Sequence, residues 1–565
     1  MRPVSVFCDT IVFMILRLTS ARAELKPSCE SAVFCHGDLL HTVQTLRIFP
    51  DQKTFVDLQL KYPEETVLNK FAALQDKNAD TVKQFVSENF LNCTTSENQC
   101  EELDRWDPPD WTSNPSIINK ITVKQYRQWA VDLNNIWKEL GRIMNNKAKQ
   151  HPEHTSLIYV PNGFIVPGGR FRELYYWDTF WIINGLLICD METTAKGIIE
   201  NLLSLVKQRG HVPNGSRVYY WERTQPPMLN LMVDSYYKRT KDEQFIKDNL
   251  ELLDQEMQYF LTNRQVSVKK DGHEYSMFRY YAPSAGPRPE SYYQDYTLAS
   301  DLNTLEEKQR LYTNLKSSAE SGWDFSTRWF IKDKTNNGTL IDVHTENIIP
   351  VDLNAILHKC FVLLSTWHKT ISKDDDKSHF YGNLANNLQK AIDNVLWNEK
   401  NSVWFDYDTL NNKQREYFYM SNFAPLWTKS YVRNKSNLAK GVVKYINKNA
   451  LFDYFGGTPT SLVYSNEQWD YPNAWAPLQA FLIQGLERTD TALGSTVASH
   501  FANVWLQSNY KGFIDERKMF EKYDATSFGK SGTGGEYEGQ AGFGWTNGFV
   551  FELLEHYFES STEHS

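Results

Sequence analysis

The chain has no surplus of positive charge. Its 60 Lys and Arg residues face 69 Asp and Glu residues, which gives a net charge of −9 and a pI of about 5.9. This balance excludes the basic groove that nucleic-acid binding requires, so we expect no nucleic-acid partner. Cysteine and histidine are also sparse, at 7 and 13 residues, and none have the spacing of a metal site. We therefore expect no metal ion and no other cofactor.

Long apolar runs are missing as well. A short run at residues 11–16 follows Arg2, and Ala21-Arg22-Ala23 matches the pattern of a signal-peptidase site. We predict that residues 1–23 are a cleaved signal peptide, the alternative being a buried N-terminal segment. No stretch of about 20 apolar residues occurs near the C-terminus. We therefore expect no membrane anchor, and a soluble protein that is secreted to the extracellular space. The sequence does not indicate the oligomeric state.

The few cysteines are informative in an oxidising compartment. Cys8 would leave with the signal peptide. Two pairs are close in sequence, and we expect them to form disulfides: Cys29 with Cys35, and Cys93 with Cys100. The other two lie in apolar surroundings and are expected to be buried free thiols: Cys189 and Cys360.

Four glycosylation sequons occur in the chain, at Asn92, Asn214, Asn337 and Asn434. A secreted protein presents such asparagines on surface loops. Asn214 stands inside a proposed ligand-binding segment, so we expect it to remain unmodified.

Helical periodicity dominates what is present. In residues 126–140, apolar side chains fall on one helical face, and residues 353–367 and 384–395 and the stretch after Pro477 repeat the pattern. Alternating patterns typical of strands are few and short. No low-complexity linker divides the chain. The sequence therefore predicts a large, mostly helical protein.

Residues 167–178 read PGGRFRELYYWD, the most informative segment of the chain. Two glycines allow a tight turn or a close approach to a ligand. Charged side chains and aromatic rings then alternate, a mixture that suits the apolar faces and hydroxyl rim of a sugar. Such charges are costly to bury unless they are paired. A structural turn held by internal salt bridges is the alternative interpretation.

Two further segments have the same character: QWDYPNAWAP at 468–477 and GGEYEGQAGFGWTNG at 534–548. Together the three resemble the PGGRFxExYxWD, QWDxPxxW and glycine-rich GGEY motifs of trehalases. These are inverting glycoside hydrolases that split α,α-trehalose into two glucose molecules. The resemblance runs from about residue 50 to 555. It implies an all-α fold, an (α/α)6 barrel at 116–560, with an N-terminal extension at 24–115 packed on the barrel.

Glycoside hydrolysis requires two carboxyl groups, and the resemblance selects them. Asp324 lies in ESGWDFSTRW, similar to the family motif that carries the general acid, and its aromatic neighbours are expected to raise its pKa. An Asp capping a helix from Phe325 is the alternative. Glu521 lies in FEKYD, similar to the motif that carries the general base, where Lys522 would help keep it ionised. A solvated charge cluster is the alternative there.

The resemblance also implies substrate-binding residues, motif by motif. Arginines among them would donate several fixed hydrogen bonds and steer carboxyl pKa values, or instead hold loops through salt bridges. The expected binding residues are Arg170, Trp177, Asp178, Asn214, Arg223, Thr224, Gln225, Arg288, Pro289, Glu290, Gly322 and Glu536.

Two other functions stay open at this stage. One is a different helical-toroid glucosidase, similar to glucoamylases, that acts on longer glucans. The other is a sugar-binding protein without catalysis, although loss of Asp324 or Glu521 would have suggested it and both are present.

Overall fold

The computed structural model describes residues 25–91 and 102–559. Helices dominate this part of the chain, and its strands are two to six residues long. The predictions for the signal peptide, Asn92 and the Cys93–Cys100 pair lie outside the described residues. Within them, no helix is long and apolar enough to cross a membrane.

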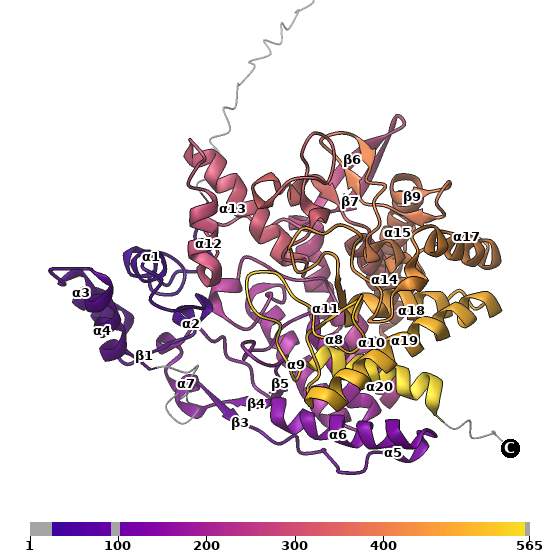
Figure 1. Ribbon diagram of the computed structural model, residues 1–565, viewed down its shortest axis with the longest axis horizontal. Helices are drawn as coiled ribbons and strands as arrows, with labels where there is room; N and C mark the ends of the chain where they lie inside the picture. Colours follow the sequence, from indigo (N-terminus) through magenta and orange to yellow (C-terminus); the bar gives the residue numbers. More distant parts are fainter. Residues whose placement is uncertain (1–24, 92–101, 560–565) are drawn as a thin grey trace, which may run out of the picture.

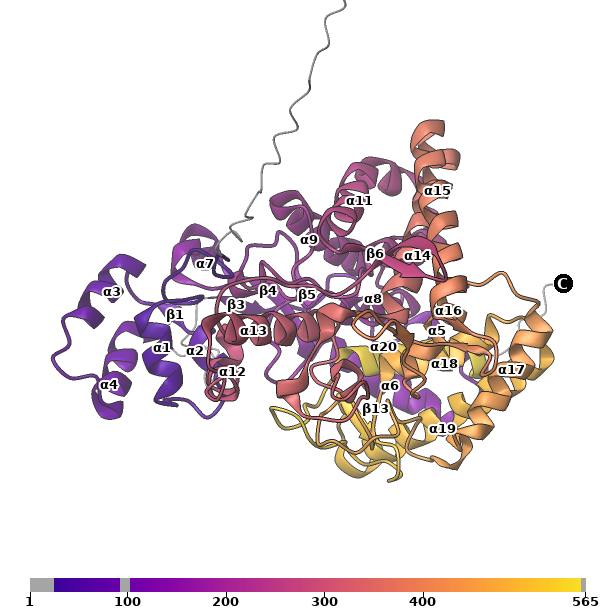
Figure 2. The same ribbon diagram turned by 90° about the horizontal axis from the view of Figure 1, so that it is seen from above.

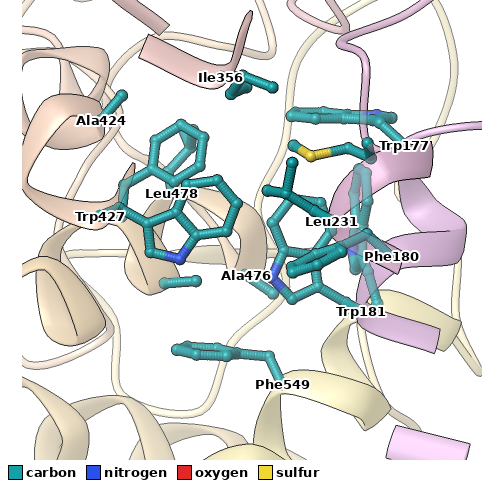
Figure 3. Packing of buried hydrophobic residues seen from close by; sticks show 14 of the residues in the cluster. Trp177, Phe180, Trp181, Leu231, Ile356, Ala424, Trp427, Ala476, Leu478 and Phe549 are labelled. Carbon is teal, nitrogen blue, oxygen red and sulfur yellow. The ribbon is translucent and has the colours of Figure 1, made fainter. Parts of the chain in front are cut away.

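Six helices form an inner ring. Each packs against the next in chain order, and the last packs against the first, which closes the ring. These helices are apolar on most sides because they are surrounded by protein. Their bounds are α8 (Asp178–Ile188), α10 (Leu229–Thr240), α14 (Val351–Trp367), α16 (Ala424–Thr428), α18 (Ala476–Glu487) and α20 (Gly544–Phe558). Figure 3 shows side chains from all six helices meeting in the centre of the ring.

Six outer helices alternate with the inner ones along the chain and pack around them. They bury one face and expose the other, as the sequence periodicity predicts. Their bounds are α6 (Lys124–Leu140), α9 (Glu192–Arg209), α11 (Glu243–Asn263), α15 (Asp375–Ala391), α17 (Lys435–Lys448) and α19 (Ala492–Glu516). This inner and outer alternation confirms the predicted (α/α)6 barrel (Figure 1). One expected core residue of α6, Ile136, is only half-buried.

A glycine pair closes the ring where α8 meets α20. A Cβ atom added to Gly548 would lie 1.9 Å from the backbone oxygen of Trp181. A Cβ added to Gly185 would lie 2.7 Å from the Cα of Gly548. The two backbones therefore approach so closely that neither position has room for a side chain.

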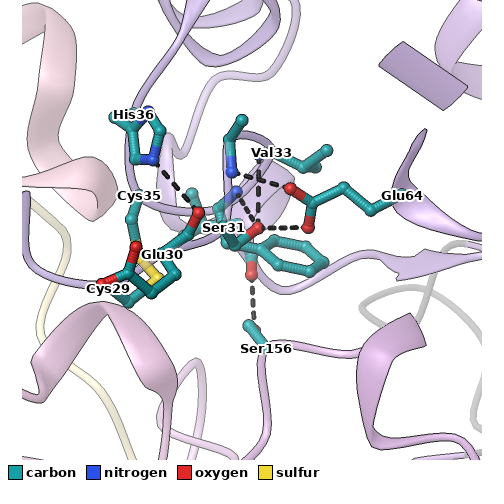
Figure 4. Close-up of a disulfide and its surroundings, with 11 residues drawn as sticks. Cys29, Glu30, Ser31, Val33, Cys35, His36, Glu64 and Ser156 are labelled. Carbon is teal, nitrogen blue, oxygen red and sulfur yellow. Dashed lines mark hydrogen bonds between the residues drawn. A yellow bond between two sulfur atoms is a disulfide. The ribbon is translucent and has the colours of Figure 1, made fainter. Parts of the chain in front are cut away.

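An N-terminal lobe lies to one side of the ring in both views (Figures 1 and 2). It holds α1 (Asp38–Thr45), α2 (Lys53–Val56), α3 (Glu64–Ala72) and α4 (Ala79–Asn89), around an apolar cluster that also includes Tyr175, Tyr219 and Tyr220 from the later part of the chain. The predicted Cys29–Cys35 disulfide is present, with a Cα–Cα distance of 5.6 Å. Beside it, the Ser31 hydroxyl donates a 2.7 Å hydrogen bond to Glu64, in the first turn of α3 (Figure 4).

A buried ionic cluster joins the lobe to the ring. Lys53 of α2 pairs with Glu173 at 2.7 Å and also with Asp57. Arg217 lies 3.2 Å from Asp57 and 3.3 Å from Glu102. All five side chains are almost fully buried, so each charge depends on its partners for compensation.

The remaining helices are α5 (Ser116–Lys120), α7 (Asn146–Gln150), α12 (Tyr292–Leu298) and α13 (Leu305–Glu320). Short antiparallel strands connect the loops. They are β1 (Gln59–Leu60) with β2 (Phe90–Leu91); β3 (Leu103–Arg105), β4 (Gly141–Met144) and β5 (Phe164–Ile165); β6 (Gln265–Lys270) with β7 (His273–Phe278); β8 (Ile348–Ile349), β11 (Tyr407–Asp408) and β12 (Lys413–Gln414); β9 (Trp397–Asn398) with β10 (Val403–Trp404); and β13 (Asn473–Trp475) with β14 (Lys522–Asp524). Cys189 and Cys360 are buried free thiols, as predicted.

Candidate active site

A cavity of about 510 Å³ opens where the inner helices begin. It is lined from the first turns of α8 and α20 and from the segments that precede α10, α14 and α18. Its size lies within the range typical of small-molecule sites. Most of the predicted site residues line it: Arg170, Trp177, Asp178, Asn214, Arg223, Gln225, Arg288, Glu290, Asp324, Glu521 and Glu536.

Three predicted binding residues do not line the cavity but lie beside residues that do. Gly322 has a φ of +79°, and a Cβ atom there would lie 2.7 Å from the Trp177 ring. Thr224 donates its hydroxyl to the Val212 carbonyl at 2.6 Å, and is fully buried. The Pro289 carbonyl accepts a hydrogen bond from the lobe. Small or rigid residues are needed here for packing, which a motif match cannot distinguish from ligand contact.

Tryptophan side chains build one wall of the cavity. Trp469 and Trp475 stack with their ring centroids 3.9 Å apart, and Trp545 and Trp177 meet Trp469 at 6.2 and 5.7 Å. The Trp545 ring nitrogen donates to the backbone oxygen of Glu521 at 3.0 Å, which fixes its orientation. Such a wall offers apolar surface to a ligand that also has polar edges.

Asp324 faces the cavity from the segment after α13. Desolvation raises the pKa of its carboxyl to about 7, and the charge of Glu536 adds to the rise while Arg288 opposes it. No helix starts at Phe325, because Ser326 instead caps a short 3-10 turn over Thr327–Trp329. The helix-capping alternative for Asp324 is therefore wrong.

Glu521 enters the cavity from the start of β14 and is 2% exposed. One carboxylate oxygen accepts the Tyr537 hydroxyl at 2.9 Å, and the other accepts the Gln540 backbone N–H at 3.0 Å. Burial raises its pKa, while the Lys522 charge and these hydrogen bonds lower it without reversing the rise. Lys522 therefore acts in the predicted direction, but burial outweighs it. The solvated-cluster alternative is wrong, since Glu521 and Lys522 are both buried.

Asp178 is a further carboxyl group of the cavity, in the first turn of α8. Burial raises its pKa to about 8, and the charges of Glu521 and Asp324 add to the rise. At neutral pH this carboxyl group holds its proton and is able to donate a hydrogen bond.

Each predicted arginine lines the cavity and is also ion-paired. Arg223 donates to Glu290 at 2.6 Å, and Arg288 lies 2.8 Å from Glu536. Arg288 makes a second pair, at 2.7 Å, with Asp295. The salt-bridge alternative is therefore present for these arginines, which still line the cavity, and their hydrogen bonds to a substrate stay a prediction.

Some lining residues were missed by the sequence reasoning. Tyr537 and Gln540 contact Glu521 and lie inside the recognised GGEYEGQ segment, so the motif itself contained their signal. Asp51 and Gln52 come from the N-terminal lobe, and no pattern in the sequence marked them. Asn214 is 5% exposed and lines the cavity, which leaves its side chain buried in the folded protein.

A second cavity, of about 500 Å³, lies at the opposite end of the ring, among the C-terminal parts of α8, α10, α18 and α20. It is lined by none of the predicted residues and by no tryptophan. Among residues 25–91 and 102–559, no cluster of His, Cys, Asp and Glu has the arrangement of a metal site.

A closed helical ring with carboxyl groups and tryptophans at its helix N-termini defines this protein as a glycoside hydrolase of the helical-toroid type. The model of the family described as Trehalase matches residues 47–558. Trehalase from Apis mellifera is 44% identical over 553 residues, which cover 98% of this chain and 88% of that protein. Trehalase from Homo sapiens is 42% identical over 543 residues, 95% of this chain and 91% of that protein.

Among solved structures, neutral trehalase Nth1 from Saccharomyces cerevisiae matches with a TM-score of 0.57 and 26% identity. The match covers 71% of this chain and 74% of that one. The chain therefore belongs to the trehalase family.

Proposed function

We propose that the protein hydrolyses α,α-trehalose to two glucose molecules with inversion at the attacked carbon, Asp324 acting as general acid and Glu521 as general base. One observation carries the assignment: among the carboxyl groups that line one cavity, Asp324 and Glu521 lie in different environments. Asp324 has a pKa of about 7 and so keeps a large protonated fraction near neutral pH. Glu521 accepts two hydrogen bonds and has a cationic neighbour, which favour its ionised form.

The chemistry then follows in one concerted displacement. Asp324 gives its proton to the glycosidic oxygen as the bond to the anomeric carbon breaks. Glu521 takes a proton from a water molecule that attacks the same carbon from the opposite face. One glucose leaves as the β-anomer, because its carbon is inverted, and the other leaves as the α-anomer.

The other lining groups supply binding. The tryptophan wall is suited to the apolar face of a glucose ring, and paired arginines offer fixed donors to hydroxyl groups. Gln225 holds Trp177 by accepting its backbone N–H at 3.0 Å. Protonated Asp178 offers a further donor beside the reacting groups. Asn214 lines the same cavity, and we assign it a hydrogen bond to substrate.

Substrate and stereochemistry are tested together. The purified protein is incubated with trehalose, maltose and maltotriose, and real-time NMR records the first products. We expect release from trehalose alone, with α- and β-glucose appearing in equal amounts. Release from maltose would instead support the glucoamylase-like alternative, and two α-anomers would contradict inversion. D324N and E521Q should each abolish turnover and retain the fold. A wild-type protein that binds trehalose but releases no glucose would instead support the sugar-binding alternative.

We also propose that the chain is divided into an N-terminal extension at 24–115 and a catalytic ring at 116–560. In support, most members of the second apolar cluster belong to the lobe, with only Tyr175, Tyr219 and Tyr220 from the ring part, and the first ring helix, α6, begins at Lys124. Limited proteolysis, which cuts first in exposed connections, tests this division. Cleavage within a ring helix before any cut near residue 115 would argue against it.

Secretion and glycosylation are proposed on separate grounds. The Cys29–Cys35 disulfide favours an oxidising compartment, and the sequon residues Asn337 and Asn434 are exposed. We propose signal cleavage near Ala23, a Cys93–Cys100 disulfide and glycans on exposed sequons. N-terminal sequencing and non-reducing peptide mapping of protein from the culture medium test all three. An intact N-terminus with free Cys93 and Cys100 would contradict the proposal.

A further inference from the structure

The side chain of Arg170 is held by Asp51, a residue of the N-terminal lobe. Its Nε atom donates to one oxygen of Asp51 at 2.7 Å, and its Nη2 atom donates to the other at 2.6 Å. The guanidinium carbon also lies 4.6 Å from the centre of the Tyr537 ring. This pairing uses the Nε and Nη2 donors, so Nη1 is the donor that we assign to a ligand. Asp51 and Arg170 both line the cavity.

Asp51 is itself fixed by the lobe. Its Oδ1 atom accepts the Lys53 backbone N–H at 3.0 Å, at the start of α2. Burial alone would raise the pKa of Asp51, but hydrogen bonding and charge from Arg170 lower it below its usual range, so the carboxylate is ionised. The side chain of Lys53 is anchored in turn by Glu173. Asp51 is therefore an anion with a 41% exposed side chain, held by hydrogen bonds to Lys53 and Arg170, that comes from outside the ring.

The lobe touches a second arginine-bearing segment. Gln44 of α1 donates to the Pro289 carbonyl at 2.8 Å, between Arg288 and Glu290. Gln52 accepts the backbone N–H of Tyr293 at 2.6 Å. The lobe thus contacts two of the segments that carry cavity arginines. These contacts connect the lobe to the cavity itself and not only to the outside of the ring.

We propose that Asp51 is a positioning residue for hydrolysis, which holds the Arg170 guanidinium in its ligand-binding orientation, and that the N-terminal lobe is thereby part of the active site. This role rests on the trehalose hydrolysis proposed above. It assigns Asp51 no contact with the reacting atoms. Its effect on the reaction passes through Arg170.

A double-mutant cycle tests this role. D51N keeps the shape of the side chain and removes its charge, and we expect it to lower kcat/KM roughly 10- to 100-fold, the loss usual for a hydrogen bond to a charged group. In the R170A background, D51N should change kcat/KM by less than about threefold, because the partner through which it acts is gone. An equal loss in both backgrounds would overturn the proposal, since Asp51 would then act on its own.

Chemical rescue supplies a readout that mere stability would not move. Guanidinium ion at millimolar concentration should partly restore R170A, and D51N/R170A should show no rescue, because the anion that holds the ion is missing. Equal rescue of both variants would overturn the proposal. The matched control is E64Q, which removes a carboxylate that braces the lobe but lies outside the cavity. It should leave kcat/KM within about twofold of wild type.

Two further measurements keep the test decisive. If D51N does not fold, D51E is the second variant. It retains the charge but places the carboxylate farther from the backbone, so we expect it to fold with a reduced kcat/KM. Full activity in D51E would overturn the positioning role. If the wild type does not hydrolyse trehalose, the proposed function has failed. Calorimetric binding of trehalose to E521Q and D51N/E521Q then still measures what Asp51 contributes, and equal affinities would overturn its role.

Discussion

Under the proposed mechanism, Asp324 sets the alkaline limit of activity. Its pKa is raised to about 7, so raising the pH through that value removes the proton that the leaving oxygen needs. On the acid side, protonation of Glu521 removes the base. We expect a bell-shaped profile of kcat/KM against pH, with the alkaline limb falling by about tenfold per pH unit above its midpoint near 7. Activity that stays level to pH 9 would contradict the assignment.

Asp178 complicates this limb, because its pKa of about 8 is coupled to Asp324. The D178N variant separates the two groups. Because Asp178 mostly keeps its proton while Asp324 titrates, its replacement by a neutral amide removes no negative charge near pH 7, and the midpoint of the alkaline limb should stay near 7. An alkaline limb that disappears in D178N would identify Asp178, and not Asp324, as the group that titrates.

Tyr537 contacts Glu521, the proposed general base. Its hydroxyl donates to Glu521 at 2.9 Å, which stabilises the ionised form. Y537F should raise the pKa of Glu521, shift the acid limb to higher pH and lower kcat/KM by roughly tenfold near neutral pH. The control is Y236F, which removes a hydroxyl bonded to Asp242 far from the cavity lining and should leave the profile unchanged. An unmoved acid limb in Y537F would show that this bond does not control Glu521.

At the scale of residues, the motifs predicted which side chains share the site but not how those side chains contact one another. The sequence could predict that Asp324, Glu521 and most of the expected binding residues share one site, because their neighbours form recognisable segments, and their roles stay predictions. Asp51 could not, because its partner Arg170 is 119 residues away and nothing local marks the pair. The net rise of the Glu521 pKa could not be predicted either. The sequence shows the neighbouring Lys522, which lowers this pKa, but not the burial that raises it.

At the scale of elements, ring closure depends on the contact between α8 and α20. G548A would place a methyl group against the Trp181 carbonyl, a backbone atom that has no alternative rotamer. We expect a loss of roughly 1–3 kcal/mol or more in the free energy of unfolding, measured by denaturant titration. G382A is the control, because in outer helix α15 the new methyl meets only the Ser365 hydroxyl at 3.2 Å. It should be neutral or stabilising by up to about 1 kcal/mol. Equal effects would show that α20 can shift away.

The elements themselves differ in how far the sequence predicted them. The outer helix α6 and the inner helix α14 follow their predicted ranges closely, because each has a long apolar repeat. Inner helix α16 has only five residues, too few for any periodicity to show. Its place in the ring comes from packing against α14 and α18. Topology likewise came from the resemblance, because periodicity alone specifies no order of packing.

At the scale of the whole molecule, Arg217 joins lobe and ring. R217A would leave the buried Glu102 carboxylate without its cation and would leave Asp57 with Lys53 alone, and we expect a loss of about 3–5 kcal/mol in the free energy of unfolding. Hydrogen exchange should rise in α1 to α4 before it rises in the inner ring. R517A, whose 69% exposed side chain pairs with Asp132 at the surface, should cost less than about 1 kcal/mol. Uniform exchange in R217A would show that lobe and ring unfold as one unit.

Closure of the ring by its last helix also fixes when activity can begin. The cavity draws Asp51 from near the start of the chain and Trp545 from near its end, and α20 must dock on α8 before the wall is complete. Contacts between such distant segments form late, after the local helices. During translation, every ring helix before α20 leaves the ribosome while the ring is still open. A nascent chain therefore has no assembled catalytic centre until α20 has been synthesised and has docked on α8.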